Sequence, residues 1–116
     1  MTPFGDRIRE ARIARKLSQR VLAEAVGINF TYLSKLENGE NPPPSEEKIY
    51  ALAEHLQIDA DELFTLAQRV PEDLTGFAMR AQMPQILRAS KELSEKDLED
   101  MLKWTQKRSK ASEEKK

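Results

Sequence analysis

The 116-residue chain has no cysteine and only four glycines. Without cysteine, disulfides, cysteine-ligated zinc sites and thiol catalysis are excluded. Few glycines, six prolines and a charged fraction of 34% are typical of a helical protein with a charged surface rather than of a β-sandwich. The length suits one compact core with a small appendage. We therefore expect an all-α protein.

Long hydrophobic runs are also missing. No stretch is apolar for long enough to span a bilayer, and the first residues, MTPFGDRIRE, lack the apolar core of a signal peptide. We expect a cytoplasmic protein with no membrane partner. No pattern of a nucleophile with its base, of a phosphate-binding loop or of clustered metal ligands stands out, so we expect no cofactor, no metal, no catalytic residues and no enzyme activity.

The charge is unevenly distributed, although the net charge is only −1. Residues 1–36 carry seven Lys/Arg against three Asp/Glu, and residues 37–67 carry one against eight. Residues 68–116 carry eleven against nine. The small sum therefore hides a positive first third of the chain.

Signals for five helices recur within the first 67 residues. Polar residues stand where N-caps are needed, apolar residues follow at helical spacing, and glycine or proline comes after them. The first helix is expected from Pro3 to Arg15, the second ends at Gly27, and ENPPPSE must be a loop because its prolines remove backbone donors. The five predicted N-caps are Thr2, Ser18, Asn29, Ser45 and Asp59.

The helix signals weaken after Ala67. QRVPEDLTGFAMRAQMP contains two prolines and a glycine, which predicts a link with one short helix near 72–79. QILRASKEL predicts another short helix, and LSEKDLEDMLKWTQKRSK a strong one with Ser94 as its N-cap. The expected domains are a five-helix domain, a helical extension and a disordered tail, over residues 1–67, 68–110 and 111–116.

Two helices joined by a turn of about three residues around Gly27 are typical of a helix-turn-helix unit. The stretch LSQRVLAEAVGINFTYLSKLENGE resembles the Cro/CI/Xre group of repressors, and the resemblance covers residues 3–67. It implies a five-helix lambda-repressor-like bundle with a helical C-terminal extension, in which a recognition helix at about 29–38 enters the DNA major groove. The competing interpretation is an ordinary helical bundle with a glycine turn.

Four residues are expected to be structural. Ala23 is small enough to stand where two helices cross, and Gly27 permits the positive φ of a tight turn. The resemblance implies that Arg12 and Glu37 form an ion pair between the first and third helices. Such a pair fixes geometry more surely than it adds stability.

The resemblance also implies which residues touch DNA. Lys35 can donate to guanine O6 or N7, and Thr31 and Phe30 can contact a thymine methyl group, although Phe30 could equally pack against the second helix. Because Glu40 and three prolines stand where phage members of the family often have Lys or Arg, we expect moderate affinity that falls steeply with salt. The base contacts implied are Phe30, Thr31, Ser34 and Lys35, and the phosphate contacts are Gln19, Arg20, Tyr32 and Asn38.

The strongest C-terminal helix carries an apolar stripe of Leu98, Met101, Leu102 and Trp104. The stripe could cover the domain's own core or pair with a second chain. A homodimer is favoured, because two copies on a palindrome raise specificity. The sequence thus predicts a transcriptional regulator, a repressor that binds double-stranded DNA as a dimer. The alternative is an antitoxin or adaptor whose C-terminal region binds a protein partner.

Overall fold

The computed structural model describes residues 2–114, which form eight helices and no strand. These residues divide into two compact units that meet between Leu74 and Thr75, so that α6 spans the boundary. None of the described helices is both long and apolar enough to cross a membrane. The helices are α1 (Pro3–Ala14), α2 (Gln19–Val26), α3 (Phe30–Glu37), α4 (Glu46–Leu56), α5 (Ala60–Leu66), α6 (Glu72–Ala78), α7 (Met83–Ser90) and α8 (Glu95–Glu114).

The N-caps predicted from the sequence begin the first five helices. In each case the capping oxygen accepts a hydrogen bond from a backbone N–H two or three residues further on, at 2.7–3.4 Å. Each such bond satisfies a donor that the first helical turn leaves open and is worth about 1 kcal/mol. The beginnings of these helices are therefore set by local residues. The caps are Thr2, Ser18, Asn29, Ser45 and Asp59.

The turn between α2 and α3 depends on Gly27, as predicted. Gly27 has a φ of 79°, in the left-handed region that favours glycine, and its N–H donates to the carbonyl of Ala23 at 2.9 Å. The Lys48 ammonium donates to the carbonyl of Val26 at 3.2 Å and so caps the end of α2 from α4. A Cβ added at Gly27 would lie 3.1 Å from that ammonium.

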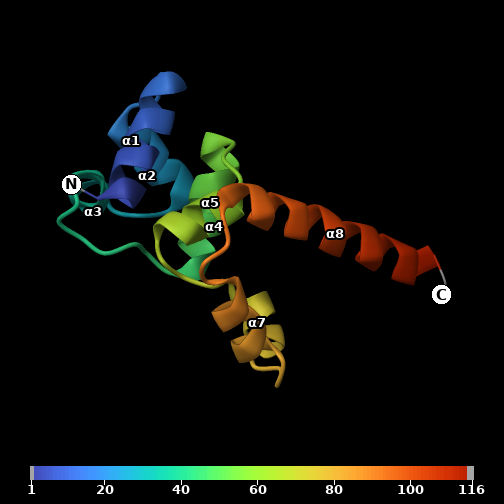
Figure 1. Ribbon diagram of the computed structural model, residues 1–116. Helices are drawn as coiled ribbons and strands as arrows, with labels where there is room; N and C mark the ends of the chain where they lie inside the picture. Colours follow the sequence, from blue (N-terminus) through green and yellow to red (C-terminus); the bar gives the residue numbers. More distant parts are fainter. Residues whose placement is uncertain (1, 115–116) are drawn as a thin grey trace. The chain divides into compact units, whose positions relative to one another are not determined.

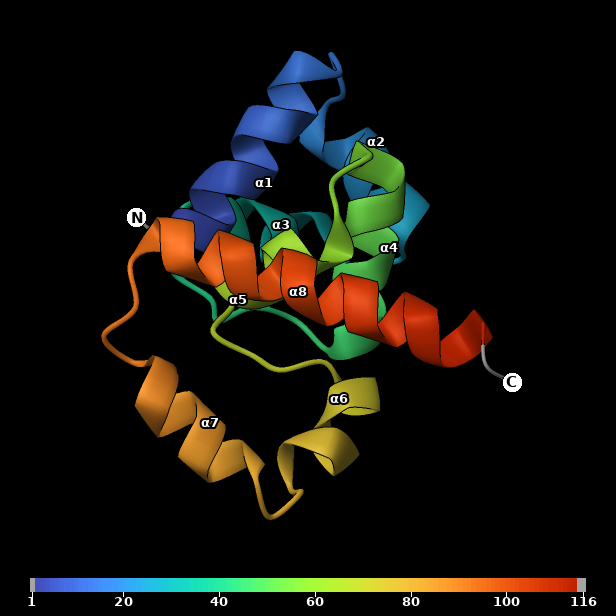
Figure 2. The ribbon, with the colours of Figure 1, turned by 45° about the vertical axis from the view of Figure 1, so that its right-hand side comes forward.

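The first unit closes around a core to which all five of its helices contribute. Helix α1 contacts α3, α4 and α5, while α2 contacts α3 and α4. In Figures 1 and 2, α1 and the α2–α3 pair (blue to teal) lie around α4 and α5 (green). The five-helix bundle is thus confirmed. Its largest fully buried apolar side chains are Phe4, Ile8, Leu22, Leu33, Leu36, Ile49, Leu52, Leu63 and Phe64.

The ion pair implied by the family resemblance joins α1 to the end of α3. Arg12 Nε donates to Glu37 Oε2 at 2.8 Å, and Nη2 donates to Oε1 at 2.9 Å. Nη1 donates to the carbonyl of Leu17 at 2.9 Å. The side chain of Glu37 is 1% exposed and that of Arg12 is 12% exposed, so the pair is almost fully removed from water.

A close approach of α1 to α3 depends on Gly5, a residue to which sequence analysis assigned no role. A Cβ at this position would collide with the carbonyl oxygen of Leu36 and come within 3.1 Å of that of Glu37. These atoms belong to backbone, which cannot move aside as the end of a flexible side chain can. Gly5 is therefore required where α1 crosses the end of α3.

The first unit ends at Leu74 rather than at the predicted residue 67. The chain beyond α5 stays attached because the Arg69 guanidinium donates to the carbonyls of Pro43 and Pro44. The carboxylate of Glu46 accepts the N–H of Glu72 at 3.1 and 3.2 Å. The proline loop is thus held by a segment that the sequence suggested was a linker.

The second unit contains the helices that the sequence predicted, with shifted ends. Ser94 Oγ accepts the N–H of Asp97 at 3.1 Å, and Asp97 accepts the N–H of Ser94 at 3.4 Å, which confirms the predicted cap of α8. Helix α8 continues to Glu114, into the segment for which the sequence predicts a disordered tail. The segment KASEE contains no helix breaker and several good helix formers. The last two residues of the predicted tail lie outside the described residues.

Replacing Gly5 by alanine is expected to destabilise the first unit by about 1–3 kcal/mol, because the methyl group would force α1 away from the Leu36 carbonyl. Urea unfolding followed by helical circular dichroism measures the loss. Gly76 is the matched control, because a Cβ there meets nothing within 4 Å. Gly76→Ala should leave unfolding of the first unit unchanged. Equal effects of the two substitutions would contradict the close approach.

Arg12→Ala is expected to cost about 3–5 kcal/mol, because it leaves the carboxylate of Glu37 buried without its cation. Arg7→Ala is the matched control on the same helix. Arg7 pairs with Glu62 at 3.3 Å in a more exposed setting, so its loss should cost under about 1 kcal/mol. Thermal and urea unfolding of both variants would compare the two pairs. Similar small losses in both would show that the buried pair does not hold α1 to α3.

Candidate nucleic-acid interface

Helix α3 presents one face to solvent and the other to the core. Leu33 and Leu36 are buried, whereas Thr31 and Lys35 are exposed. Residues four apart lie on the same side of a helix, so Thr31 and Lys35 point outward together. Ser34, another predicted base contact on this helix, is half-buried.

Phe30, the first residue of α3, lies against a side chain of α2. The guanidinium carbon of Arg20 stands 4.4 Å from the centre of the Phe30 ring, a cation–π contact. The ring is still 37% exposed. Phe30 therefore contacts the second helix and also presents an apolar surface to solvent, so that both interpretations from the sequence describe part of its setting.

Gln19, predicted to contact phosphate, is held by the buried ion pair. Its Nε2 donates to Glu37 Oε1 at 3.1 Å, the oxygen that also accepts from Arg12 Nη2. One N–H of the amide is thus used to orient the side chain, and the other remains available. The first backbone N–H groups of α2 have no acceptor within the helix, and they carry the positive end of its dipole. This corner is suited to an anionic oxygen.

The side chains of Tyr32 and Asn38 differ in whether their hydrogen-bonding groups are available to a phosphate. The Tyr32 hydroxyl donates to the carbonyl of Pro42 at 3.1 Å, which fixes the proline loop to α3. A phosphate oxygen only accepts hydrogen bonds, so a phosphate would compete with Pro42 for this proton. Asn38, at the end of α3, is exposed.

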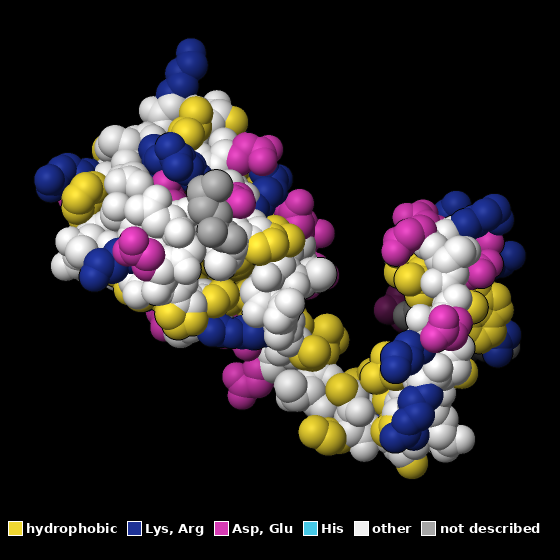
Figure 3. Space-filling model, turned by 60° about the vertical axis from the view of Figure 1, so that its left-hand side comes forward, with side chains coloured by type: hydrophobic (Ala, Val, Ile, Leu, Met, Phe, Trp, Pro, Cys, Tyr) yellow, Lys and Arg dark blue, Asp and Glu magenta, His cyan; other side chains and the backbone are white. Residues whose placement is uncertain are grey.

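Basic side chains on α1 are partly engaged with the protein. Arg15 donates to the carbonyl of Leu56 at 2.9 Å and to the side chain of Gln57, and Arg7 pairs with Glu62. Figure 3 views the first unit from the side on which α3 lies in Figure 1, and its dark-blue side chains are spread out rather than massed. The described exposed cations with no hydrogen bond or ion pair to protein in this unit include Arg9, Lys16, Arg20 and Lys35.

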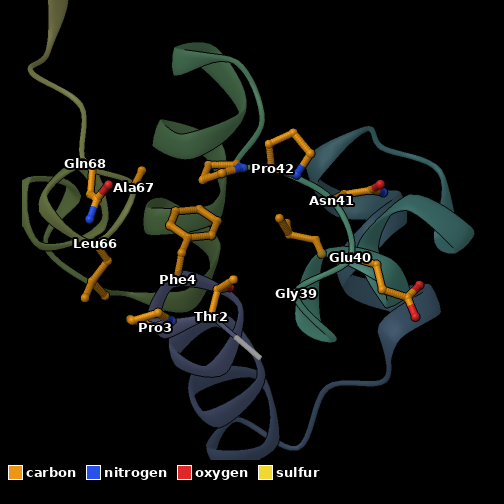
Figure 4. A pocket seen from close by; sticks show the side chains of 12 residues that line it. Thr2, Pro3, Phe4, Gly39, Glu40, Asn41, Pro42, Leu66, Ala67 and Gln68 are labelled. Atoms are coloured by element: carbon orange, nitrogen blue, oxygen red, sulfur yellow. The ribbon is translucent and has the colours of Figure 1, made fainter.

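A cavity of about 330 Å³ opens between the start of α1, the loop after α3 and the end of α5. Figure 4 shows Phe4, Pro42 and Leu66 around it, so its wall is largely apolar. Every buried side-chain nitrogen or oxygen in the described part of the chain has a hydrogen-bond partner. Sequence analysis did not predict this cavity, and no polar group in its wall calls for a ligand.

Metal-ligating side chains do not gather in the described residues: no group of three His, Cys, Asp or Glu could hold a metal ion there. His55 is exposed on α4. The acidic residues at the starts of α4 and α5 face helix N-termini, where negative charge is favoured. The features that could recognise a ligand are therefore the outward face of α3 and the N-terminus of α2.

Known proteins are similar in sequence to the part of the chain that carries these helices. The helix-turn-helix family matches residues 8–63. In Bacillus subtilis (strain 168), the uncharacterized HTH-type transcriptional regulator RghRB is 39% identical over 77 residues, 64% of this chain and 55% of RghRB. The HTH-type transcriptional repressor RghR of the same strain is 35% identical over 72 residues, 62% of this chain and 53% of RghR. The chain thus matches about half the length of these curated relatives.

A solved structure gives a further match, the restriction-modification controller protein C.AhdI from Aeromonas hydrophila. It is 41% identical in sequence, and the match covers 53% of this chain and 91% of C.AhdI, with a TM-score of 0.48. Residues 8–63 therefore carry a helix-turn-helix domain of the Cro/CI/Xre type, similar to the domain of these transcriptional regulators.

Proposed function

We propose that this protein is a transcriptional repressor that binds a palindromic operator as a homodimer. The observation that carries the proposal is the outward face of α3, where Thr31 and Lys35 are exposed on a helix anchored by the buried carboxylate of Glu37. The relative RghR is named a transcriptional repressor, which supports repression rather than activation. Repression by occupying promoter DNA requires no chemical step.

The base contacts follow from the side chains that α3 exposes. Lys35 donates to guanine O6 or N7 in the major groove, and Thr31 offers a hydroxyl and a methyl group. Ser34 and Phe30 flank these two residues, the serine less exposed than the others. Contacts to base edges carry the sequence information.

Phosphate contacts position the helix in the groove. Gln19 has a free amide N–H next to the open N–H groups of α2, and Glu37 fixes the direction of its side chain. Asn38 is the proposed second clamp, at the other end of α3. Such contacts set register and orientation and make the affinity depend on salt.

The second unit is proposed to form the dimer. None of its described side chains over residues 75–113 is buried, although α8 carries Leu98, Met101, Leu102 and Trp104, the last 63% exposed. Figure 3 shows apolar side chains (yellow) on the surface of this unit. A helix of 20 residues is about 30 Å long, and a second copy of the stripe would cover it across a two-fold axis.

The same stripe also supports the second candidate function, an antitoxin or adaptor that binds a different protein through its C-terminal helices. Apolar side chains that find no core within their own unit require a partner surface, whatever its identity. The two functions differ in the oligomeric state of the purified protein.

The test of DNA binding is selection of random duplexes with the full chain at two salt concentrations. We expect an enriched palindrome with half-sites about one helical turn, ~34 Å, apart. Thr31→Ala combined with Lys35→Ala should weaken binding to that duplex by about a hundredfold or more, because both outward contacts are lost. Glu54→Ala, an exposed substitution on α4, is the control and should retain affinity. Unchanged affinity of the double variant would contradict the placement of α3 in the groove.

The test of the dimer interface is sedimentation of the full chain. Leu98→Asp combined with Leu102→Asp places charge in the stripe and should convert a dimer into a monomer, since two desolvated carboxylates per chain would have to be buried. Lys103→Asp, an exposed neighbour, is the control and should remain dimeric. A double variant that stays dimeric would locate the interface elsewhere, and a monomeric parent protein would favour the partner-binding function.

A further inference from the structure

Arg20 has an unusual setting among the exposed cations of the first unit. Its guanidinium lies over the face of Phe30, with the carbon 4.4 Å from the ring centre, and the structure describes no hydrogen bond or ion pair for it. Its N–H donors are therefore unused, while its position is fixed by the ring. The side chain comes from the first turn of α2 and meets the first residue of α3.

We infer that Arg20 reads a guanine in the major groove, next to a thymine whose methyl group contacts Phe30. Sequence analysis assigned Arg20 to phosphate, so this gives the residue a role in specificity. The inference rests on the proposed DNA-binding function, since it places Phe30 and the start of α3 against base edges.

The geometry of the stack directs the donors of Arg20. A guanidinium is planar and carries its N–H groups at the edge of that plane, and the carbon of the Arg20 guanidinium lies over the Phe30 ring. Two parallel N–H groups match O6 and N7 of guanine, whereas a lysine at the same place would offer only a point charge. The ring thus holds the guanidinium of Arg20 in a position from which two of its N–H groups can bind one guanine.

The spacing of the stack suits adjacent base pairs. Successive base pairs are about 3.4 Å apart along the duplex, so two groups whose centres lie 4.4 Å apart are near enough to each other to reach neighbouring base pairs. An apolar ring meeting a thymine methyl would therefore place the guanidinium beside the neighbouring base. The pair Arg20 and Phe30 then reads a two-base step containing thymine and guanine.

Other groups at this corner are suited to the phosphate role. Gln19 is oriented by Glu37 and lies at the N-terminus of α2, with the open backbone donors of the first turn beside it. Lys35 lies more than one helical turn along α3 from Phe30 and addresses a separate base. Arg20 adds a base position that the outward face of α3 does not itself supply.

The experiment is random-duplex selection with five full-length proteins: the parent, Arg20→Lys, Arg20→Ala, Phe30→Leu and Gln19→Ala. Arg20→Lys keeps the charge but removes the two parallel N–H groups that bind O6 and N7 of guanine. At one position of each half-site, the preference for guanine over the other bases should therefore fall by about tenfold or more. Preferences at the other positions should remain. Phe30→Leu keeps an apolar contact and removes the ring face, so it should weaken the same guanine preference while keeping thymine. Gln19→Ala should weaken all sequences alike.

The outcomes separate this inference from the proposed function. If Arg20→Lys retains every base preference, and Arg20→Ala weakens all duplexes equally with a salt slope reduced by about one, Arg20 is a phosphate contact and the inference is overturned. In that case DNA binding by α3 still stands. If the parent protein enriches no sequence at either salt, the proposed function fails and this inference fails with it.

Discussion

The carboxylate of Glu37 is the constraint on which the first unit depends. It is almost fully buried, and a buried charge is tolerated only when it is paired and hydrogen-bonded. Two donors of Arg12 on α1 and one of Gln19 on α2 meet it, so one side chain at the end of α3 ties three helices together. Gly5 allows the approach, because the Leu36 carbonyl occupies the space that a Cβ would need.

The function proposed for the outer face of α3 follows from how the inner face is held. Since Leu33, Leu36 and Glu37 are all buried, rotation of the helix would expose apolar surface or an unpaired charge. The outward face of α3 therefore keeps one orientation on the first unit without help from a ligand. The hydrogen bond from the Tyr32 hydroxyl to the Pro42 carbonyl also fixes the position of the proline loop relative to α3. Preorganised contacts of this kind reduce the entropy lost on binding.

The sequence predicted features that depend on near neighbours. Caps such as Ser18 and the left-handed Gly27 need only a few adjacent residues, so their signals are local. Contacts between distant segments were harder to predict. The Arg12 pair followed from family resemblance, and packing of Phe30 on the second helix was one of two interpretations. The need for Gly5, the choice of Arg20 as the partner of Phe30 and the bond from Tyr32 appeared only in three dimensions. A glycine within a helical pattern was the available signal for Gly5, because such a glycine costs stability unless packing requires it.

The most direct test of the account is nuclear magnetic resonance of the full chain bound to its selected duplex, read as contacts between protein and DNA protons. The account predicts contacts from Phe30, Thr31 and Lys35 to protons in the major groove, including a thymine methyl group. Contacts confined to sugar protons, or contacts to bases from α4 or α5 instead, would contradict the central claim that the outward face of α3 reads the operator.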